Sequence, residues 1–385
     1  MKQSLTIPFN KPYLTGKELD YIKDAVSRGK ISGNGYYTQK CHEFFQVRYS
    51  FKKCLLTTSC TDALEMAAIL CNIQTGDEVI VPSYTFVSTA NAFVLRGAKI
   101  VFADSREDHP GIDERKIESL ITARTKVIVT VHYAGVACDM DVIMDIAKRH
   151  NLLVVEDAAQ AIDSYYNGKP LGGIGHFGCF SFHETKNIQC GEGGMLVIND
   201  EQFNKRAEII WEKGTNRTEF FRGEVNKYGW VDIGSSFLPS EITAAFLYAQ
   251  LEAIDEIQHK RKQIWQHYYN GLKPLADKGI IKLPFLPDFA SNNGHMFYLL
   301  CNNLDERTSL IAYLKKQNII SVFHYLSLHR SPFFTQITIT DGQKNELPFS
   351  DYYEATLVRV PLFYEIIALD ISYIIQTILS FNLFN

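Results

Sequence analysis

The sequence predicts an α/β protein: a large domain built on a mostly parallel sheet, followed by a smaller α+β domain. Two observations predict this fold. Short apolar runs alternate with helical patterns from about residue 55 to 200, and a chain of 385 residues exceeds one small hydrophobic core. Uninterrupted apolar strands separated by helices are typical of parallel sheets that helices cover on both faces.

The predicted strands follow one another at short intervals. Before the fourth of them, residues 142–147 have helical spacing and predict a buried apolar face that includes Val142. Ligands of open α/β sheets bind at the carboxyl ends of the strands. Asp104, His132 and Asp157 follow such ends. The predicted strands are residues 78–81, 99–104, 126–131, 152–155 and 195–198.

The C-terminal part predicts the second domain. A helical pattern over roughly residues 240–272 carries the chain into it, and three prolines interrupt the segment after this pattern. We therefore divide the chain into a large domain, residues 1–250, which includes the N-terminal segment, and a small domain, residues 251–385. The prolines are Pro274, Pro284 and Pro287, and the later predicted elements are strands at 297–300 and 321–323 and helices at 306–317 and within 367–384.

Composition excludes several classes of protein. A net charge of −4 gives no reason to expect nucleic-acid binding. The eight cysteines form no Cys-x-x-Cys pair, so we expect no metal site or redox motif, and free thiols indicate a reducing cytoplasm. The N-terminus has no apolar run like a signal peptide, and no apolar stretch reaches the roughly 20 residues of a membrane span.

A lysine and an acidic residue form the most informative pair in the chain. Lys186 lies in the segment Ser181–Asn187, and Asp157, 29 positions earlier, ends an apolar strand. Enzymes that use pyridoxal 5′-phosphate (PLP) bind it through a lysine Schiff base, and an acid keeps the pyridine nitrogen protonated, so that the ring acts as an electron sink. A lone lysine is usually a surface residue; the combination predicts a PLP site with Lys186 as its catalytic lysine.

The segment Thr57–Leu64 predicts a site for the phosphate. Ser59, Cys60 and Thr61 precede a helical run, and small hydroxyl residues with free backbone N–H groups at a helix start suit an anion. Alone, the same pattern predicts an ordinary N-cap. With Lys186 present, the phosphate interpretation is favoured, and Ser181 could add a hydroxyl.

Three further side chains are candidates for contacts with the cofactor ring. Tyr84 or Phe86, after a strand, could stack on the ring or be a core aromatic, and spacing does not separate the two. Asp157 could meet the pyridinium or cap a following helix, with Glu156 as the competing carboxylate. Gln160 could donate to the ring oxygen or be a solvated helix residue.

The loop around Lys186 has two further features. His183 either lines the substrate side or supports the loop. The glycine-rich run Gly191–Gly194 leads into a predicted strand, so we interpret it as a turn that presents Lys186 and not as a nucleotide-binding loop. A Schiff-base lysine needs its neutral form, which burial beside a cationic ring favours.

With these residues in place, the chain resembles the DegT/DnrJ/EryC1/StrS family of sugar-nucleotide aminotransferases. The resemblance runs nearly end to end, and its most specific stretches are residues 82–106, 131–135, 154–160 and 181–187. Within the family it resembles most the dTDP-4-amino-4,6-dideoxygalactose transaminases of enterobacterial common antigen synthesis. The resemblance implies PLP-dependent fold type I with a seven-stranded sheet, and a homodimer with shared active sites.

The resemblance also implies roles for matching residues. Lys186 would bind the cofactor and shuttle the proton, Asp157 would meet the pyridine nitrogen, and Gln160 the ring oxygen. Residues Ser59, Cys60, Thr61 and Ser181 would surround the phosphate, and Phe86 or Tyr84 would cover the ring.

The chain departs from the family pattern at two places. Ser236 stands where many members have an asparagine that the neighbouring subunit supplies to the phosphate pocket. Cys60 stands in a turn that usually reads Ser-Gly-Thr, so it could contribute only its backbone. The dTDP-fucosamine-type subgroup shares both changes, so neither indicates loss of function.

The resemblance implies a two-step transamination. L-Glutamate would leave its amino group as pyridoxamine 5′-phosphate, and dTDP-4-keto-6-deoxy-D-glucose would receive it at C4. The galacto product, dTDP-Fuc4N, is favoured, in a pathway to O-antigen lipopolysaccharide or another surface polysaccharide. Candidate substrate contacts are His183, Lys213, Arg217, His295, His324 and His329, of which the last three could equally be packed histidines.

Other reactions stay open at this point. No motif fixes the face of C4, so a gluco product, dTDP-Qui4N (viosamine), is the first alternative. Amination of a C3-keto sugar is a second. A PLP-dependent sugar dehydratase is a third, although those relatives carry histidine in place of the lysine. A non-catalytic PLP-binding relative is the last, and the chain has no spare length for a DNA-binding domain.

Overall fold

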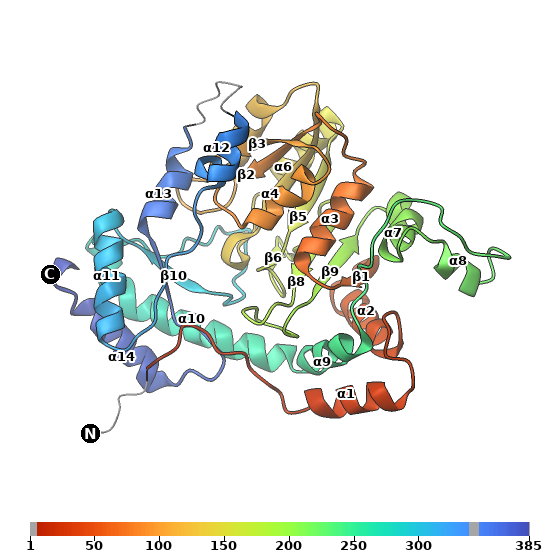
Figure 1. Ribbon diagram of the computed structural model, residues 1–385. Helices are drawn as coiled ribbons and strands as arrows, with labels where there is room; N and C mark the ends of the chain where they lie inside the picture. The colour runs from red at the N-terminus through yellow and green to blue at the C-terminus, as the bar shows by residue number, and fades with distance from the viewer. Residues whose placement is uncertain (1–5, 339–345, 385) are drawn as a thin grey trace.

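The computed structural model describes residues 6–338 and 346–384 (Figure 1). The part of the chain predicted as the large domain contains a seven-stranded sheet with strand order β1-β9-β8-β5-β4-β2-β3. β9 runs antiparallel to both of its neighbours, whereas the pairs on the other side of β8 are parallel. The predicted α/β class with a mostly parallel sheet is therefore confirmed. The strands are β1 Lys53–Thr57, β2 Glu78–Pro82, β3 Lys99–Ala103, β4 Thr125–Val131, β5 Leu153–Asp157, β8 Phe177–Ser181 and β9 Gly194–Ile198.

Helices cover both faces of this sheet because successive strand residues point to opposite sides. In β2, Ile80 belongs to the core on the side of α2, α6 and α9, whereas Val79 and Val81 belong to the core on the side of α3, α4 and α7. The predicted helical face before β5 is wrong at Val142, which is exposed while its neighbour Ile143 is buried. The covering helices are α2 Tyr36–Tyr49, α3 Cys60–Leu70, α4 Val87–Val94, α6 Met140–His150, α7 Asn204–Trp211 and α9 Glu241–Glu252.

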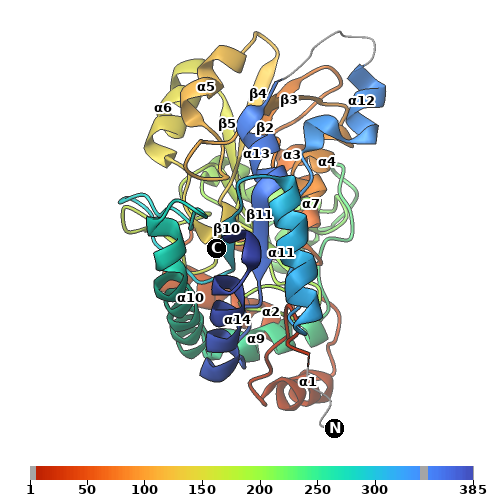
Figure 2. The same cartoon turned by 90° about the vertical axis from the view of Figure 1, so that its left-hand side faces the viewer.

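The C-terminal part has its own apolar core, which helices α10, α11 and α14 and a two-stranded sheet build (Figure 2). β10 pairs with β11 antiparallel, and Ile7 of the N-terminal segment joins this core. The predicted boundary at residue 250 falls in the last turn of α9, and the division into two domains stays a prediction. The elements are α10 Ile254–Asp277, β10 Phe297–Leu300, α11 Leu304–Lys316, β11 Leu357–Val360 and α14 Ala368–Leu379.

Two details of this region differ from the sequence-based prediction. The helical pattern over 240–272 is two helices, because the backbone of Ala253 leaves the helical region at φ −100° and ψ 8°. Pro274 lies inside α10 and does not end it. The predicted strand at 321–323 is a single bridge between Val322 and Arg359.

The remaining elements are short or peripheral. α1 packs against α9, and α8 stands away from the sheet at the right of Figure 1. None of the helices in residues 6–338 and 346–384 is long and apolar enough to cross a membrane. These elements are α1 Glu18–Ser27, α5 Glu114–Ile117, α8 Arg217–Phe221, α12 Pro332–Thr338, α13 Pro348–Thr356, β6 Tyr165–Tyr166, β7 Lys169–Pro170, and the 3-10 turns η1 Glu118–Leu120, η2 Tyr133–Gly135, η3 Glu201–Phe203, η4 Leu328–Arg330 and η5 Asn382–Phe384.

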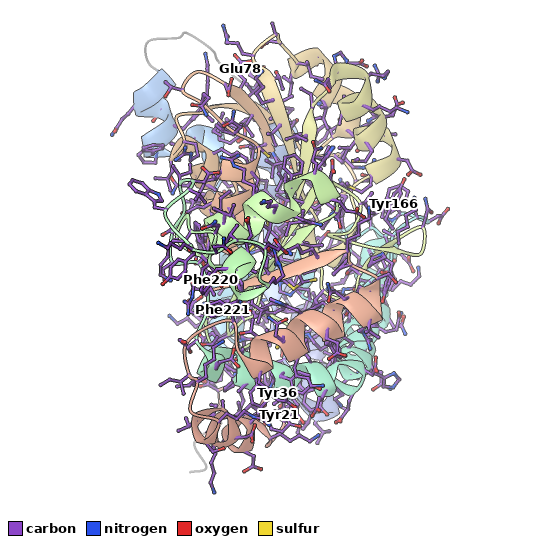
Figure 3. The ribbon with its side chains drawn as sticks, turned by 90° about the vertical axis from the view of Figure 1, so that its right-hand side faces the viewer. Tyr21, Tyr36, Glu78, Tyr166, Phe220 and Phe221 are labelled. Atoms are coloured by element: carbon purple, nitrogen blue, oxygen red, sulfur yellow. The ribbon has the colours of Figure 1, made fainter. Side chains whose placement is uncertain are left out.

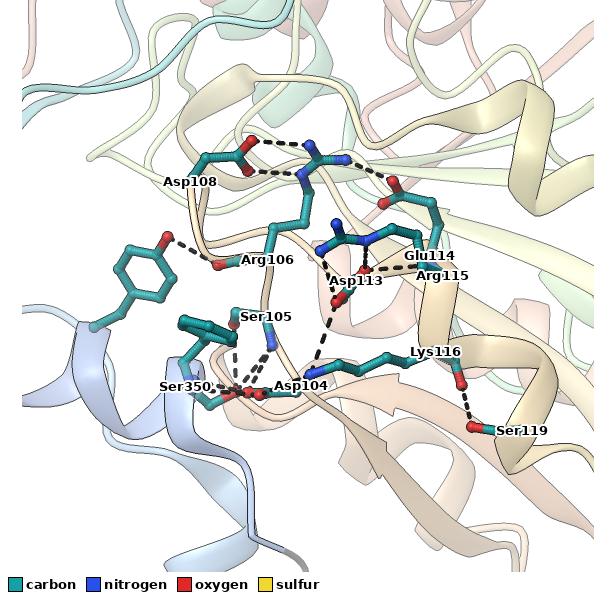
Figure 4. Close-up of polar contacts among 12 residues, drawn as sticks. Asp104, Ser105, Arg106, Asp108, Asp113, Glu114, Arg115, Lys116, Ser119 and Ser350 are labelled. Carbon is teal, nitrogen blue, oxygen red and sulfur yellow. Dashed lines mark hydrogen bonds and ion pairs between the residues drawn. The ribbon is translucent and has the colours of Figure 1, made fainter.

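A carboxylate at the end of β3 docks α13 onto the large domain (Figure 4). Asp104 Oδ1 accepts hydrogen bonds from the Ser350 backbone N–H at 2.8 Å and from the Ser350 hydroxyl at 2.9 Å. The Tyr353 hydroxyl donates to the Arg106 carbonyl at 2.9 Å. Asp104 thus satisfies backbone donors at the start of a helix, and its role is to hold the two parts of the chain together.

Candidate active site

A cavity of about 420 Å³ opens between the carboxyl ends of the sheet strands and the small domain. Its volume lies within the range of small-molecule sites. The large domain contributes the start of α3, the segment after β2, the ends of β5 and β8 and the loop before β9. The lining includes Ser59, Cys60, Thr61, Phe86, Asp157, Gln160, Ser181, His183 and Lys186 from that domain, and His295, His324, Tyr325 and Arg359 from the other.

Lys186 lies in the closed loop between β8 and β9. Its backbone N–H donates to the His183 carbonyl at 2.9 Å, and the Glu184 N–H donates to the Gly191 carbonyl at 2.8 Å. The glycine-rich run is therefore part of the turn that presents Lys186. Burial lowers the pKa of Lys186, and the nearby charge of Arg359 lowers it further. Both effects favour the neutral amine, which is the nucleophilic form.

Asp157 and Glu156 are adjacent carboxylates with separate surroundings, because neighbouring strand residues face opposite sides. Asp157 lines the cavity, is only 6% exposed, and accepts hydrogen bonds from the Thr89 hydroxyl at 2.7 Å and the Ala159 N–H at 3.1 Å. Burial raises its pKa. Glu156 points away, accepting from the Gly172 N–H at 2.7 Å. Of the two, Asp157 is therefore the carboxylate placed to meet a ring N–H.

The start of α3 forms one end of the cavity. The Ser59 hydroxyl accepts from the Asp62 N–H at 3.0 Å, so Ser59 is an N-cap, as the simpler prediction has it. The same helix start lines the cavity, and the hydroxyls of Thr61 and Ser88 lie 2.8 Å apart there. A Cβ on Gly194 would come within 2.4 Å of the Cys60 nitrogen, so only glycine lets β9 pass this close. Backbone N–H groups at a helix start suit an anion.

The two candidate stacking aromatics separate clearly. Phe86 is 55% exposed and lines the cavity. Tyr84 is 1% exposed, lies outside the lining, and packs against the ring of Tyr133 with centroids 5.6 Å apart. Tyr84 is thus the core aromatic, and Phe86 is the side chain available to a planar cofactor ring.

Gln160 is a cavity residue held on both sides. Its Oε1 accepts from the Ala134 N–H at 2.6 Å, and its Nε2 donates to the Tyr325 hydroxyl at 2.9 Å. Residues 158–164 form turns and not a helix. The alternatives of a helix N-cap at Asp157 and a solvated helix residue at Gln160 are therefore wrong.

The four candidate histidines do not share one environment. His183 lines the cavity, and its Nδ1 lies 2.9 Å from the Thr185 hydroxyl. His295 and His324 also line it, and burial lowers the pKa of each well below its usual value, so both are neutral. His329 lies outside the lining, with its Nδ1 2.7 Å from the Ser83 hydroxyl. It is a packed histidine at the junction of η4 and β2.

Besides Tyr84 and His329, three predicted residues lie outside the cavity lining. Lys213, Arg217 and Ser236 are exposed and belong to one segment, residues 212–236, which the Glu212–Ser236 bridge closes. Within this chain the structure does not bring them to Lys186. Their sequence neighbourhood gave no signal of this, because the path of the segment depends on its tertiary packing.

Among the residues of the cavity region that sequence reasoning missed, three bear on its chemistry. Thr89 reaches Asp157 through the packing of α4, and Tyr325 holds Gln160. Arg359 lines the cavity from β11. A signal for it existed, because it is the only charged residue in the apolar run Leu357–Leu362.

These residues fit PLP. A buried acid, a helix start suited to an anion, an exposed aromatic and a lysine of lowered pKa line one cavity. Asp157 would hold the pyridine nitrogen, and Lys186 would bind the cofactor covalently. The start of α3 and Ser181 would hold the phosphate.

Comparison with known proteins agrees with this site. The model of the DegT/DnrJ/EryC1/StrS aminotransferase family matches residues 12–379, so the chain belongs to that family and is a PLP-dependent sugar aminotransferase. It is 31% identical to the spore coat polysaccharide biosynthesis protein SpsC of Bacillus subtilis, over 98% of this chain and 97% of that protein. It is 33% identical to the GDP-perosamine synthase of Caulobacter vibrioides, over 84% and 83%.

A solved structure shares the whole architecture. The aminotransferase from Psychrobacter cryohalolentis superposes with a TM-score of 0.89 at 26% identity, over 96% of this chain and 98% of that one. The predicted fold class is therefore confirmed by an independent structure as well as by the strand order.

Proposed function

We propose that this protein transfers the amino group of L-glutamate to C4 of dTDP-4-keto-6-deoxy-D-glucose and forms the galacto product, dTDP-Fuc4N. One observation carries the aminotransferase part: Lys186, Asp157 and the start of α3 line the same cavity. The nucleotide and the sugar rest on the resemblance of the sequence. When bound, PLP supplies an electron sink that stabilises negative charge at the carbon losing its proton.

The residues of the chain divide the remaining work. Lys186, favoured as the neutral amine, takes a proton from the amino donor and returns one to the sugar carbon. Asp157 orients the cofactor and keeps its ring nitrogen protonated. The neutral rings of His295 and His324 border the space beside Lys186 and are available to sugar hydroxyls.

We also propose a homodimer with shared active sites. Segment 212–236 exposes large apolar side chains, including Phe221 at 70% and Trp230 at 84% exposed. Phe220 and Phe221 lie on the face turned toward the viewer in Figure 3. Exposed apolar clusters of this kind mark interaction sites. A second copy that covers this segment would bring Lys213, Arg217 and Ser236 to its own cavity, which would explain their distance from Lys186 here.

The setting of the reaction is part of the proposal. All eight cysteines are free thiols, which supports a reducing compartment such as the cytoplasm. The name of SpsC supports a pathway to a surface polysaccharide. The name of GDP-perosamine synthase favours a second candidate, a GDP-linked keto sugar as the acceptor.

Proton NMR of the product tests the proposal. Purified protein with PLP, L-glutamate and dTDP-4-keto-6-deoxyglucose should give a product with a small H3–H4 coupling, which indicates an axial amine and the galacto sugar. A large coupling would indicate the gluco product, and turnover of the GDP-linked or the C3-keto sugar alone would favour those acceptors. Loss of a sugar hydroxyl without an added amine would indicate a dehydratase.

A lysine variant serves as the control. Lys186→Ala should abolish turnover, because the lost group is the nucleophile and the proton carrier. The variant should still fold, with a cooperative thermal unfolding transition like that of the wild type. Full turnover in that variant would refute the assignment of Lys186. Bound PLP with no turnover of any sugar by the wild type would indicate a non-catalytic relative.

A further inference from the structure

Arg359 is a cation in the cavity that no carboxylate among the described residues neutralises. It lines the cavity from β11, on the small-domain side. Within residues 6–338 and 346–384 it forms no ion pair, and its Nε is buried without a hydrogen-bond partner. Burial lowers its pKa, and the opposing effects come from tyrosines such as Tyr133 and Tyr325 and not from a carboxylate. A desolvated charge without a partner is costly in a protein.

The position of Arg359 is fixed by its backbone and by one aromatic ring. Its N–H donates to the Val322 carbonyl at 2.8 Å, and the Val322 N–H donates back at 3.1 Å. On the other side it pairs with Tyr298 of β10. Its guanidinium carbon lies 4.7 Å from the ring centroid of Phe9, a cation–π distance. The head group is therefore held in the cavity and does not reach solvent-exposed acids.

A second buried arginine shows what a structural role would look like. Arg261 donates from Nε to the Gly294 carbonyl at 3.0 Å and from Nη2 to the His295 carbonyl at 2.8 Å. Its guanidinium is thus occupied by the backbone that it supports. Arg359 has no comparable carbonyl contacts among the described residues, so its donors are left for a ligand.

We propose that Arg359 binds the carboxylate of the amino donor, which rests on the proposed function. A guanidinium presents a planar pair of donors that matches a carboxylate. Arg359 lies close enough to Lys186 for its charge to act on that amine. In an amino acid the α-carboxylate is separated from the reacting nitrogen by one carbon. In the sugar nucleotide the whole pyranose ring separates C4 from the diphosphate, which therefore lies farther from Lys186.

Loss of the Arg359 charge should affect the two half-reactions differently. The glutamate step uses a substrate that carries the carboxylate, whereas the sugar step places a neutral ring at the same position. Arg359→Met keeps the length of the side chain and removes its charge. We expect the glutamate concentration that half-saturates conversion of the PLP form to the pyridoxamine form to rise at least about tenfold. The step with the pyridoxamine form and dTDP-4-keto-6-deoxyglucose should change by less than about threefold.

Two further variants complete the half-reaction experiment. Arg359→Lys keeps the charge without the planar fork and should recover part of the affinity for glutamate. Arg307→Met is the matched control, because Arg307 also lies over a ring, that of Phe323 at 5.2 Å, and also has a buried Nε, but it is outside the cavity lining. Arg307→Met should leave both steps unchanged. Absorbance of the cofactor follows both steps in stopped flow.

Calorimetry of ligand binding gives a readout that does not depend on turnover. Glutarate, a dicarboxylate without an amine, should bind the wild-type holoenzyme at least about tenfold more tightly than the Arg359→Met holoenzyme. The affinity for dTDP should agree within about twofold between them. Equal glutarate affinity in the two proteins would overturn the proposal, and so would weakened dTDP binding, which would assign Arg359 to the diphosphate.

Different experimental results would contradict the role of Arg359 and the proposed function. If glutamate fails to convert the wild-type cofactor, the choice of amino donor is wrong, and the glutarate titration alone then decides the role of Arg359. If the wild type aminates the sugar but Arg359→Met slows both half-reactions equally, the function stands and this inference is wrong. Melting temperatures and bound PLP, measured for each variant, identify a variant that has not folded.

Discussion

The adjacent carboxylates of β5 should respond to amide substitution in opposite ways. Glu156 is fully buried, and each of its oxygens accepts two hydrogen bonds. Oε1 accepts from the backbone N–H groups of Ile174 at 2.7 Å and Gly175 at 2.5 Å. Oε2 accepts from the Gly172 N–H at 2.7 Å and lies 2.9 Å from His132 Nε2. An amide in place of the carboxylate would turn an N–H₂ group toward one of these pairs of donors.

The expected loss of stability follows from the number of donors that each Glu156 oxygen accepts. In Glu156→Gln, two donors lose their acceptor, and each buried donor left without a partner costs about 1–3 kcal/mol. We expect a loss of about 4 kcal/mol, which lowers the melting temperature by about 8 °C at about 2 °C per kcal/mol for a chain of this size. A change of tautomer at His132 would not reduce this loss of stability, because Nδ1 already accepts from the Cys138 N–H at 3.3 Å.

Asp157→Asn should leave the fold intact. The Asn oxygen can still accept from the Ala159 N–H, and the Thr89 hydroxyl can rotate to accept from the new amide. The substitution also removes a buried charge, so the melting temperature should change by less than about 2 °C. Turnover should fall by about 100-fold or more, because an amide does not keep the pyridine nitrogen protonated.

Thermal unfolding of the cofactor-free proteins separates the two cases without a contribution from ligand binding. The wild type and both variants are compared at pH 7, and PLP and substrates are then added to measure turnover. A melting temperature of Glu156→Gln within about 2 °C of the wild type would refute the reasoning. So would a destabilised Asp157→Asn, because the two carboxylates would then share one structural role.

Three other outcomes follow from the structure. Burial, with the nearby charge of Lys53, lowers the pKa of His42 to about 3, and its ring accepts the Leu56 N–H, so stability should fall as pH drops below about 6.5. In His42→Gln, which keeps an acceptor, the free energy of unfolding in urea should fall by about 2 kcal/mol less than in the wild type between pH 7 and pH 5. Phe86→Ala should weaken PLP binding about tenfold in a fluorescence titration, and unchanged binding would exclude Phe86 as the stacking ring. Trp230→Ser should shift the mass measured by light scattering toward the monomer, whereas substitution of another exposed side chain, Leu369→Ser on α14, should not. No shift with Trp230→Ser would contradict the dimer surface.

The sheet was largely predictable because its strands are apolar runs with clear ends. β2, β3, β4, β5 and β9 lie where the sequence predicts them. β1 and β8 have no comparable signal, since Lys53–Thr57 has a single β-branched residue, Thr57, and Phe177–Ser181 has none. β1 joins the sheet through β9, and β8 joins it through β9 and β5.

Site residues were predictable where a reactive side chain lies near the carboxyl end of a strand. Lys186 and Asp157 line one cavity because parallel strands end at the same edge of the sheet. The sequence did not distinguish Tyr84 from Phe86 as the stacking ring. The two differ in burial, which depends on packing against the C-terminal part of the chain.

Contacts that depend on tertiary folding could not be predicted from the sequence. The path of residues 212–236 takes Lys213, Arg217 and Ser236 away from the cavity of their own chain. Arg359 lines the cavity through the tertiary packing of β11. The apolar run around Arg359 marks it as unusual, but no local pattern encodes where either set of side chains lies.

Borohydride reduction of the PLP-loaded protein, followed by peptide mass spectrometry, tests the central claim most directly. Reduction fixes the link between PLP and its lysine as a stable secondary amine. The account predicts one modified peptide, the one that contains Lys186, and no such peptide from Lys186→Ala. Cofactor attached to a different lysine of the wild type, or no covalent attachment at all, would contradict the assignment of this cavity as the catalytic site.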